Sequence, residues 1–191
     1  MLGALCAQAD KKKTERSLFD IGGLEACMVT PVGKTPGSRV ILYLHGGGYV
    51  AGSIAYAIGF GCVLSVATGL RTLCLAYRLA PENPYPAAVD DALAAYRYLI
   101  EGGCEPSDIV LAGESAGGGL CFALVHRLKR LGEALPGALV AISPWTDLTC
   151  SLPSHEKNAD KDPTLLTDML TDYAEMYASG RLDEPEVSPL V

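Results

Sequence analysis

Short apolar runs alternate with longer segments of helical character along most of the chain. The runs contain apolar residues at nearly every position, which is typical of strands that are buried on both faces of a sheet. The predicted strands cover residues 39–45, 71–77, 108–113 and 137–143. A helical segment follows each of the first three, so the pattern predicts an α/β fold with a mostly parallel sheet sandwiched between helices.

The predicted helices span residues 54–69, 87–103 and 116–132. Glycines at their ends supply helix stops, and the middle helix places its apolar residues on one face. Residues 19–31 predict a leading hairpin around Gly22 and Gly23. The chain shows no repeat and no low-complexity tract, so residues 1–191 are predicted to form a single domain.

The chain has 191 residues, of which 49% are hydrophobic and 19% charged, as expected for a globular domain. Its net charge of −7 argues against nucleic acid or an anionic membrane surface as a partner, because both need a basic face. Residues 40–70 lack charged side chains, but seven glycines and His45 interrupt them, which predicts buried elements and no membrane span. The seven cysteines form no CxxC pair, which predicts neither a disulfide framework nor a metal site and favours a reducing, cytoplasmic location.

The sequence G-E-S-A-G, residues 113–117, lies where a predicted strand gives way to a predicted helix. A tight turn at such a place exposes its central serine above the sheet, and glycines two positions to either side let strand and helix approach closely. This context makes Ser115 a candidate nucleophile. A serine that merely caps the following helix is the structural alternative.

A second glycine-rich stretch, H-G-G-G at residues 45–48, follows the first predicted central strand. Attack of a serine on an ester carbonyl places negative charge on the carbonyl oxygen, which backbone N–H groups can stabilise. Consecutive glycines offer such amides, and the amide of Ala116 would complete the set. A flexible loop or a phosphate-binding loop is the alternative, but Tyr49 and Val50 stand where a phosphate loop needs Lys followed by Ser or Thr.

Four stretches together resemble the hormone-sensitive-lipase-like branch of the α/β-hydrolases, the bacterial family IV esterases. They are HGGGYVAGS (45–53), YRLAPENPYPAAVDDA (77–92), GESAGGGL (113–120) and SPWTDLT (143–149). The resemblance implies the α/β-hydrolase fold, with the strand at 71–77 between the leading hairpin and the strand at 39–45. It also implies a serine carboxylesterase that hydrolyses small, short-chain acyl esters through an acyl-enzyme intermediate and needs no cofactor.

The resemblance further implies a nucleophile and three backbone donors to its oxyanion, namely Ser115, Gly46, Gly47 and Ala116. Gly48 is expected to shape the loop. His45 is expected to order the same loop by hydrogen bonding, and Glu114 to accept hydrogen bonds from nearby loop amides. The short stretch before the match, residues 1–18, implies a reduced N-terminal cap segment.

The chain departs from the family pattern at its end. The family's acid and histidine follow the segment V-S-P-L (187–190), and the sequence stops one residue later. His126 lies about 16 Å along the helix from Ser115, which excludes it as the base, and His155 falls in a polar loop. We therefore expect a hydrolase sheet that lacks its last strands, an impaired esterase, and an exposed edge at 138–142 that favours homo-oligomers. The alternative function is a non-catalytic, hydrolase-like protein that binds a small ligand in the same pocket.

Overall fold

The structure is a computed structural model that describes residues 13–35 and 37–190. Within these ranges six strands form one sheet in the order β1-β2-β4-β3-β5-β6. The strands are β1 (Thr14–Ile21), β2 (Leu24–Pro31), β3 (Val40–Leu44), β4 (Arg71–Leu75), β5 (Ile109–Glu114) and β6 (Ala138–Ile142). The first two pairings, β1 with β2 and β2 with β4, are antiparallel, and β4, β3, β5 and β6 run parallel. This arrangement confirms the predicted fold class and strand order.

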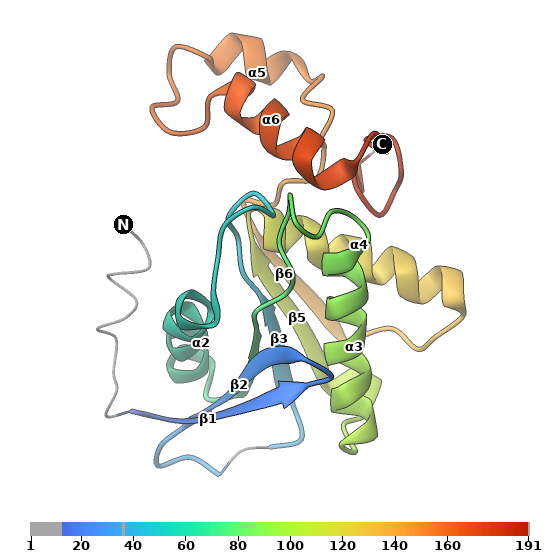
Figure 1. Ribbon diagram of the computed structural model, residues 1–191. Coiled ribbons are helices and arrows are strands. Elements are labelled where there is room, and N and C mark those ends of the chain that lie inside the picture. Colours follow the sequence, from blue (N-terminus) through green and yellow to red (C-terminus); the bar gives the residue numbers. More distant parts are fainter. Residues whose placement is uncertain (1–12, 36, 191) are drawn as a thin grey trace.

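Helices cover both faces of the sheet. They are α2 (Ile54–Thr68), α3 (Ala87–Glu101), α4 (Ala116–Leu131), α5 (Pro153–Asn158) and α6 (Thr167–Ala178), with a short 3-10 helix, η1 (Pro106–Asp108). Figure 1 shows α2 on one face of the sheet and α3 and α4 on the other. Gly69 and Gly132 end α2 and α4 in the left-handed conformation, with φ of 74° and 69°, as their positions predict.

The central strands bury both of their faces. All five residues of β3 are buried: Val40, Leu42 and Leu44 belong to the larger core beneath α3 and α4, whereas Ile41 and Tyr43 belong to the smaller core beneath α2. Because successive side chains point to opposite faces of a strand, a strand with helices on both sides must be apolar at every position. That requirement explains the uninterrupted apolar runs in the sequence.

The leading hairpin is longer than predicted. Its first strand, β1, begins at Thr14. Residues 14–18 of the predicted cap segment 1–18 therefore belong to the sheet, and this part of the prediction is wrong. Residues 1–12 of that segment lie outside the described residues. Most side chains of β1 are exposed because the strand lies at the edge of the sheet, and an exposed strand need not be apolar. Its polar composition therefore concealed it.

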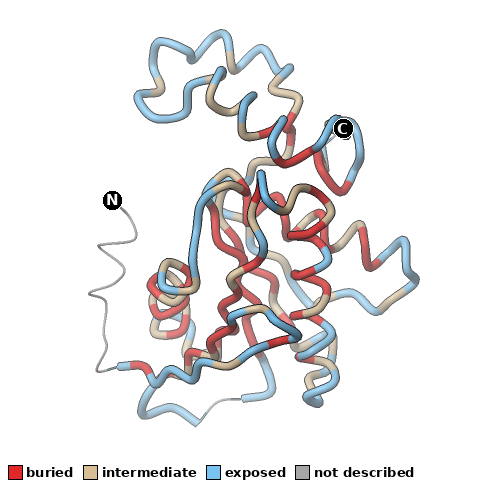
Figure 2. The backbone as a smooth tube through the Cα atoms, viewed as in Figure 1, coloured by how far each residue is buried: buried red, intermediate tan, exposed pale blue. Residues whose placement is uncertain are grey.

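The segment after β6 lies beyond the carboxyl ends of the strands. Figure 1 shows α5 and α6 above that end of the sheet, and Figure 2 shows that much of this segment is exposed, in contrast to the buried central strands.

At the opposite edge from β1, β6 pairs with β5 alone within the described part of the chain, and Val140 and Ile142 remain 50% and 42% exposed. No helix among the described residues is long and apolar enough to cross a membrane.

Candidate active site

Ser115 occupies a strained turn between β5 and α4. Its backbone has φ 53° and ψ −123°, a conformation that is uncommon for a residue with a side chain. Its N–H donates to the carbonyl oxygen of Ile142 at 3.0 Å, and its carbonyl accepts from the N–H of Trp145 at 2.9 Å. The side chain makes no capping hydrogen bond to the helix. The capping alternative is therefore wrong, and the hydroxyl is left available for chemistry.

Glycine is required on both sides of this turn for lack of space. A Cβ added at Gly113 would lie 2.3 Å from the carbonyl oxygen of Gly117, and one added at Gly117 would lie 2.1 Å from that of Leu44. Both distances are shorter than any that real Cβ atoms show. The close approach of strand, helix and loop that the G-x-S-x-G spacing predicts is thus confirmed.

The glycine loop after β3 forms a tight turn. Gly47, Gly48 and Tyr49 have φ of 117°, 63° and 63°, and the Gly47 carbonyl accepts from the N–H groups of Val50 and Ala51 at 3.1 and 2.9 Å. A Cβ at Gly47 would lie 2.0 Å from the carbonyl oxygen of Ala51. The turn leaves the amides of Gly47 and Gly48 without an acceptor among the described residues.

Glu114 ties the nucleophile turn to the glycine loop. Its Oε1 accepts from the Gly46 N–H at 2.7 Å and from the Tyr56 hydroxyl at 3.2 Å, and its Oε2 accepts from the Tyr43 hydroxyl at 2.8 Å. Burial, reinforced by the Glu114 carboxylate, raises the pKa of Tyr43, so this hydroxyl remains a donor. The expected bond between Glu114 and a loop amide is therefore present.

The same bond requires a correction to the predicted oxyanion donors. Because the Gly46 N–H is held by Glu114, it is not free to meet a substrate oxygen, and Gly46 does not line the cavity at Ser115. Gly47 and Gly48 do line it. Ala116 is buried and, like Gly46, does not line it, but as the first residue of α4 it has no acceptor within its own helix for its N–H. The sequence shows three equivalent glycines, and only the fold distinguishes the amide that faces the carboxylate.

His45 holds the base of the loop. Its Nδ1 donates to the carbonyl of Gly46 at 2.7 Å, and its ring stacks on Tyr77 with the ring centroids 4.2 Å apart. Burial lowers the pKa of His45, against a smaller opposing effect of the bond to Gly46, so the ring is neutral. The Tyr77 hydroxyl donates to the His45 carbonyl at 2.6 Å. These contacts fit the predicted ordering role.

A cavity of about 320 Å³ opens at Ser115. Its lining comprises Gly47, Gly48, Ser115, Ser143, Pro144, Trp145, His155, Leu165, Met169, Leu170 and Tyr173. The loop and the serine thus share one space with an apolar wall that comes mainly from α6 and the segment before it. A larger cavity of about 450 Å³ is lined by charged groups and His126, and Ser115 is not part of its lining. This separation agrees with the exclusion of His126.

His155 lies closer to the chemistry than its polar sequence context indicates. It belongs to α5 and lines the Ser115 cavity, although no hydrogen bond joins the two side chains in the described structure. The α6 wall was also missed, but a signal exists: Met169, Leu170 and Tyr173 follow a helical spacing.

The fold, the nucleophile turn and the glycine loop define a class of protein. A family model described as the alpha/beta hydrolase fold matches residues 41–191. The chain therefore belongs to the α/β-hydrolases, and its similarities place it in the hormone-sensitive-lipase-like branch.

Known proteins of this kind are similar over most of the chain. An acetyl-hydrolase of Streptomyces hygroscopicus is 46% identical over 142 residues, which are 74% of this chain and 48% of that protein. A putative acetyl-hydrolase, LipR, of Mycobacterium tuberculosis is 36% identical over a match that spans 100% of this chain and 62% of that protein. The crystal structure of an esterase from the bacterial hormone-sensitive lipase family matches with a TM-score of 0.91 and 38% identity, over 99% of this chain and 64% of that one. The chain thus spans about half to two thirds of the length of these relatives.

Proposed function

We propose that this chain provides the nucleophile and oxyanion site of a serine carboxylesterase. The observation that supports this most directly is the shared cavity: Ser115, in a strained turn, faces the same space as the unpaired amides of Gly47 and Gly48. The proposed donor set is Gly47, Gly48 and Ala116, because the Gly46 amide is held by Glu114. These amides are arranged before substrate arrives, so they cost little reorganisation in the reaction.

The proposed reaction has two halves. The Ser115 oxygen attacks the ester carbonyl and loses its proton to a general base, while the three amides stabilise the oxygen that becomes negatively charged. The alcohol leaves with a proton returned by the base, and water then hydrolyses the acyl-enzyme by the same route. The resemblance places the acid and histidine of the triad after residue 190, so the described residues supply the nucleophile and the oxyanion donors of this mechanism.

The cavity favours small esters. Its volume of about 320 Å³ and its apolar wall of Trp145, Leu165, Met169 and Leu170 suit a short acyl chain and a small alcohol. Relatives named acetyl-hydrolase and, in Pseudomonas putida, ethyl acetate hydrolase support this choice. The acidic charge supports a neutral ester over a nucleic acid, and the free, mostly buried cysteines among the described residues support a cytoplasmic location.

A fluorophosphonate probe tests the proposal in a protein that includes the acid and histidine expected after residue 190, because the probe forms a covalent bond with an activated serine and needs no deacylation step. We expect mass spectrometry to locate the adduct on the peptide that contains Ser115, and a short-chain ester in excess to slow its formation. An adduct on another residue, or none after prolonged exposure, would contradict the proposed nucleophile.

One observation favours the non-catalytic alternative. Within the described residues the Ser115 side chain has no hydrogen bond to a base. A small-ligand-binding protein would bind short-chain esters without turnover and without reacting with the probe. The same labelling experiment, run beside a binding measurement with the ester, therefore separates the two functions.

The glycine loop gives a second prediction. In Gly47→Ala the new Cβ would lie 2.0 Å from the Ala51 carbonyl oxygen, so the turn must open and its amides must rotate. We expect the rate of probe labelling to fall roughly 10²-fold, as when one oxyanion donor is lost, while the thermal transition of the fold remains. Gly37→Ala is the matched control, because a Cβ there meets nothing within 4 Å. If Gly47→Ala is labelled at the wild-type rate, the amides of this loop do not stabilise the oxyanion formed at Ser115.

A further inference from the structure

Two aromatic residues of α6 rest on the glycine loop. The ring of Tyr177 stacks on that of Tyr49, with centroids 3.8 Å apart and planes 6° from parallel, and each tyrosine is only 1% exposed. One turn earlier in the helix, Tyr173 packs against Gly48, where an added Cβ would lie 2.6 Å from its ring. The helix thus covers the two residues that follow Gly47.

Tyr49 needs this support because its backbone is strained. It is the third successive residue with positive φ, at 63°, and it is the one of the three that carries a side chain. Its carbonyl accepts from the Ala80 N–H at 2.9 Å, which fixes one side of the residue. The aromatic stack fixes the other side. The peptide groups that precede Tyr49 belong to the proposed oxyanion donors, so the ring position and the donor directions are linked.

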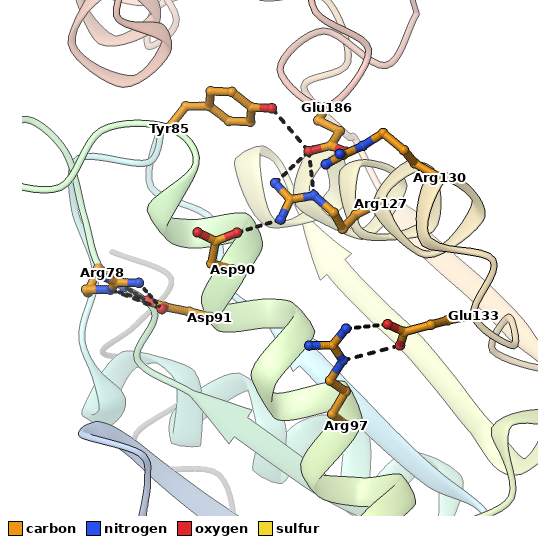
Figure 3. A network of polar contacts seen from close by, with 9 residues as sticks. All are labelled: Arg78, Tyr85, Asp90, Asp91, Arg97, Arg127, Arg130, Glu133 and Glu186. Atoms are coloured by element: carbon orange, nitrogen blue, oxygen red, sulfur yellow. Dashed lines mark hydrogen bonds and ion pairs between the residues drawn. The ribbon is translucent and has the colours of Figure 1, made fainter.

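The end of α6 is itself anchored to the body of the domain. The Tyr85 N–H donates to the Tyr177 carbonyl at 2.7 Å, and the Tyr85 hydroxyl donates to Glu186 at 3.1 Å. Glu186, on the segment after α6, pairs with Arg127 at 2.7 Å and with Arg130 at 3.0 Å, both from α4 (Figure 3). The backbone of Tyr177 is therefore fixed to the rest of the domain, while its ring contacts Tyr49 of the glycine loop.

We infer that Tyr177 is a positioning residue for the oxyanion loop, an inference that rests on the proposed esterase function. It acts through its ring and not through its hydroxyl, since that buried hydroxyl has no hydrogen-bond partner among the described residues. The ring stack keeps Tyr49 in its strained conformation and thereby keeps the Gly47 and Gly48 amides directed into the cavity. Loss of the stack lets the turn relax and the donors turn away.

Tyr177→Phe and Tyr177→Leu separate the ring from the rest of the side chain. Phe keeps the stack and removes an unpaired buried hydroxyl, so we expect labelling of Ser115 by the fluorophosphonate within about twofold of the wild-type rate. Leu keeps apolar bulk without a ring face, and we expect the rate at saturating probe to fall about tenfold or more. The probe concentration at half-maximal rate should change little, because donors that act on the transition state do not bind the ground state.

Amide hydrogen exchange gives a readout that does not depend on reactivity. Tyr177→Leu should speed exchange in residues 46–52 relative to wild type, and Tyr177→Phe should not. Tyr96→Leu is the control for general loss of packing, since Tyr96 is a fully buried tyrosine outside the cavity lining. If Tyr177→Leu does not fold, Tyr49→Leu removes the other ring of the stack and must likewise slow labelling and speed exchange in residues 46–52.

The outcomes are distinct. A folded Tyr177→Leu that reacts and exchanges like the wild type overturns the positioning role, as does a Tyr177→Phe that is as impaired as the leucine variant. In the double variant with Tyr49→Leu the loss should be smaller than the sum of the two single losses, because both substitutions remove the Tyr49–Tyr177 stack; fully additive losses would also contradict the inference. A wild-type protein that includes the triad base and that the probe does not label refutes the proposed function, whereas exchange in residues 46–52 still decides whether Tyr177 holds the loop.

Discussion

Ser115→Ala is expected to abolish covalent labelling by the fluorophosphonate and any acyl transfer to the chain. The reason is that the reaction has no covalent step without the hydroxyl, and the amides around it can stabilise an oxyanion but cannot form one. The fold should be retained, because the Ser115 hydroxyl makes no capping bond and alanine is strained by the φ of 53° no more than serine is. Intact-mass spectrometry after exposure to probe, beside circular dichroism of the variant, measures both expectations.

Ser143 offers a matched control for this variant. It lines the same cavity, so Ser143→Ala tests whether a second hydroxyl in that space reacts. We expect Ser143→Ala to be labelled like the wild type, because Ser143 precedes Pro144 in an irregular segment and no helix begins beside it. Labelling that survives in Ser115→Ala and disappears in Ser143→Ala would reassign the nucleophile.

Glu186→Ala is expected to destabilise the fold by about 3 kcal/mol. Glu186 is 8% exposed and joins Arg127 and Arg130, so its removal leaves the buried Arg127 guanidinium without its nearest buried carboxylate. Breaking a buried ion pair costs about 3–5 kcal/mol, and the lower value applies because Asp90 still pairs with Arg127 at 2.5 Å. Urea unfolding followed by the fluorescence of Trp145, the single tryptophan, measures the change.

The pH dependence of the same pair has a definite sign. Burial would raise the pKa of Glu186, but the hydrogen bonds from Arg127 and Arg130 outweigh it and hold the pKa below its ordinary value. A carboxyl with a lowered folded-state pKa stabilises the fold above its unfolded pKa, about 4.3, and that contribution is lost as pH falls through the folded value. The difference between wild type and Glu186→Ala should therefore be constant near neutrality and shrink below about pH 4.

The Arg97–Glu133 pair is the control for an exposed interaction of the same chemistry. Its side chains are 48% and 29% exposed, so water screens the pair. Glu133→Ala should cost no more than about 1 kcal/mol. Equal losses for Glu133→Ala and Glu186→Ala would mean that burial does not govern the strength of these pairs in this protein.

The sequence predicted the sheet well because burial on two faces leaves a strong pattern. The apolar runs that became β3, β4, β5 and β6 have no competing interpretation once helices are placed between them. The edge strand β1 was partly missed because an exposed strand carries no such pattern. The position of β2 beside β4 could be predicted only from the resemblance, because the residues of these strands do not indicate which strand each one pairs with.

The site was predictable as far as single positions determine it. The turn at Ser115 follows from the need for glycine at 113 and 117, which is a local steric fact. The use of the Gly46 amide by Glu114 is not local, because it joins residues that are 68 positions apart. The same holds for the cover that α6 places on the glycine loop, which arises from packing between distant segments.

The contact of backbone on backbone at Gly113 and Gly117 sets a limit on how this protein can be varied. At Gly132 an added Cβ would contact nothing within 4 Å, so the position requires only a residue that can adopt the left-handed conformation, and asparagine can do so. Positions 113 and 117 have no space for a Cβ atom, so only glycine fits there. A combinatorial library that reshapes the pocket can therefore randomise codons such as those of Leu165 and Met169, but every member needs the two glycine codons that flank the serine.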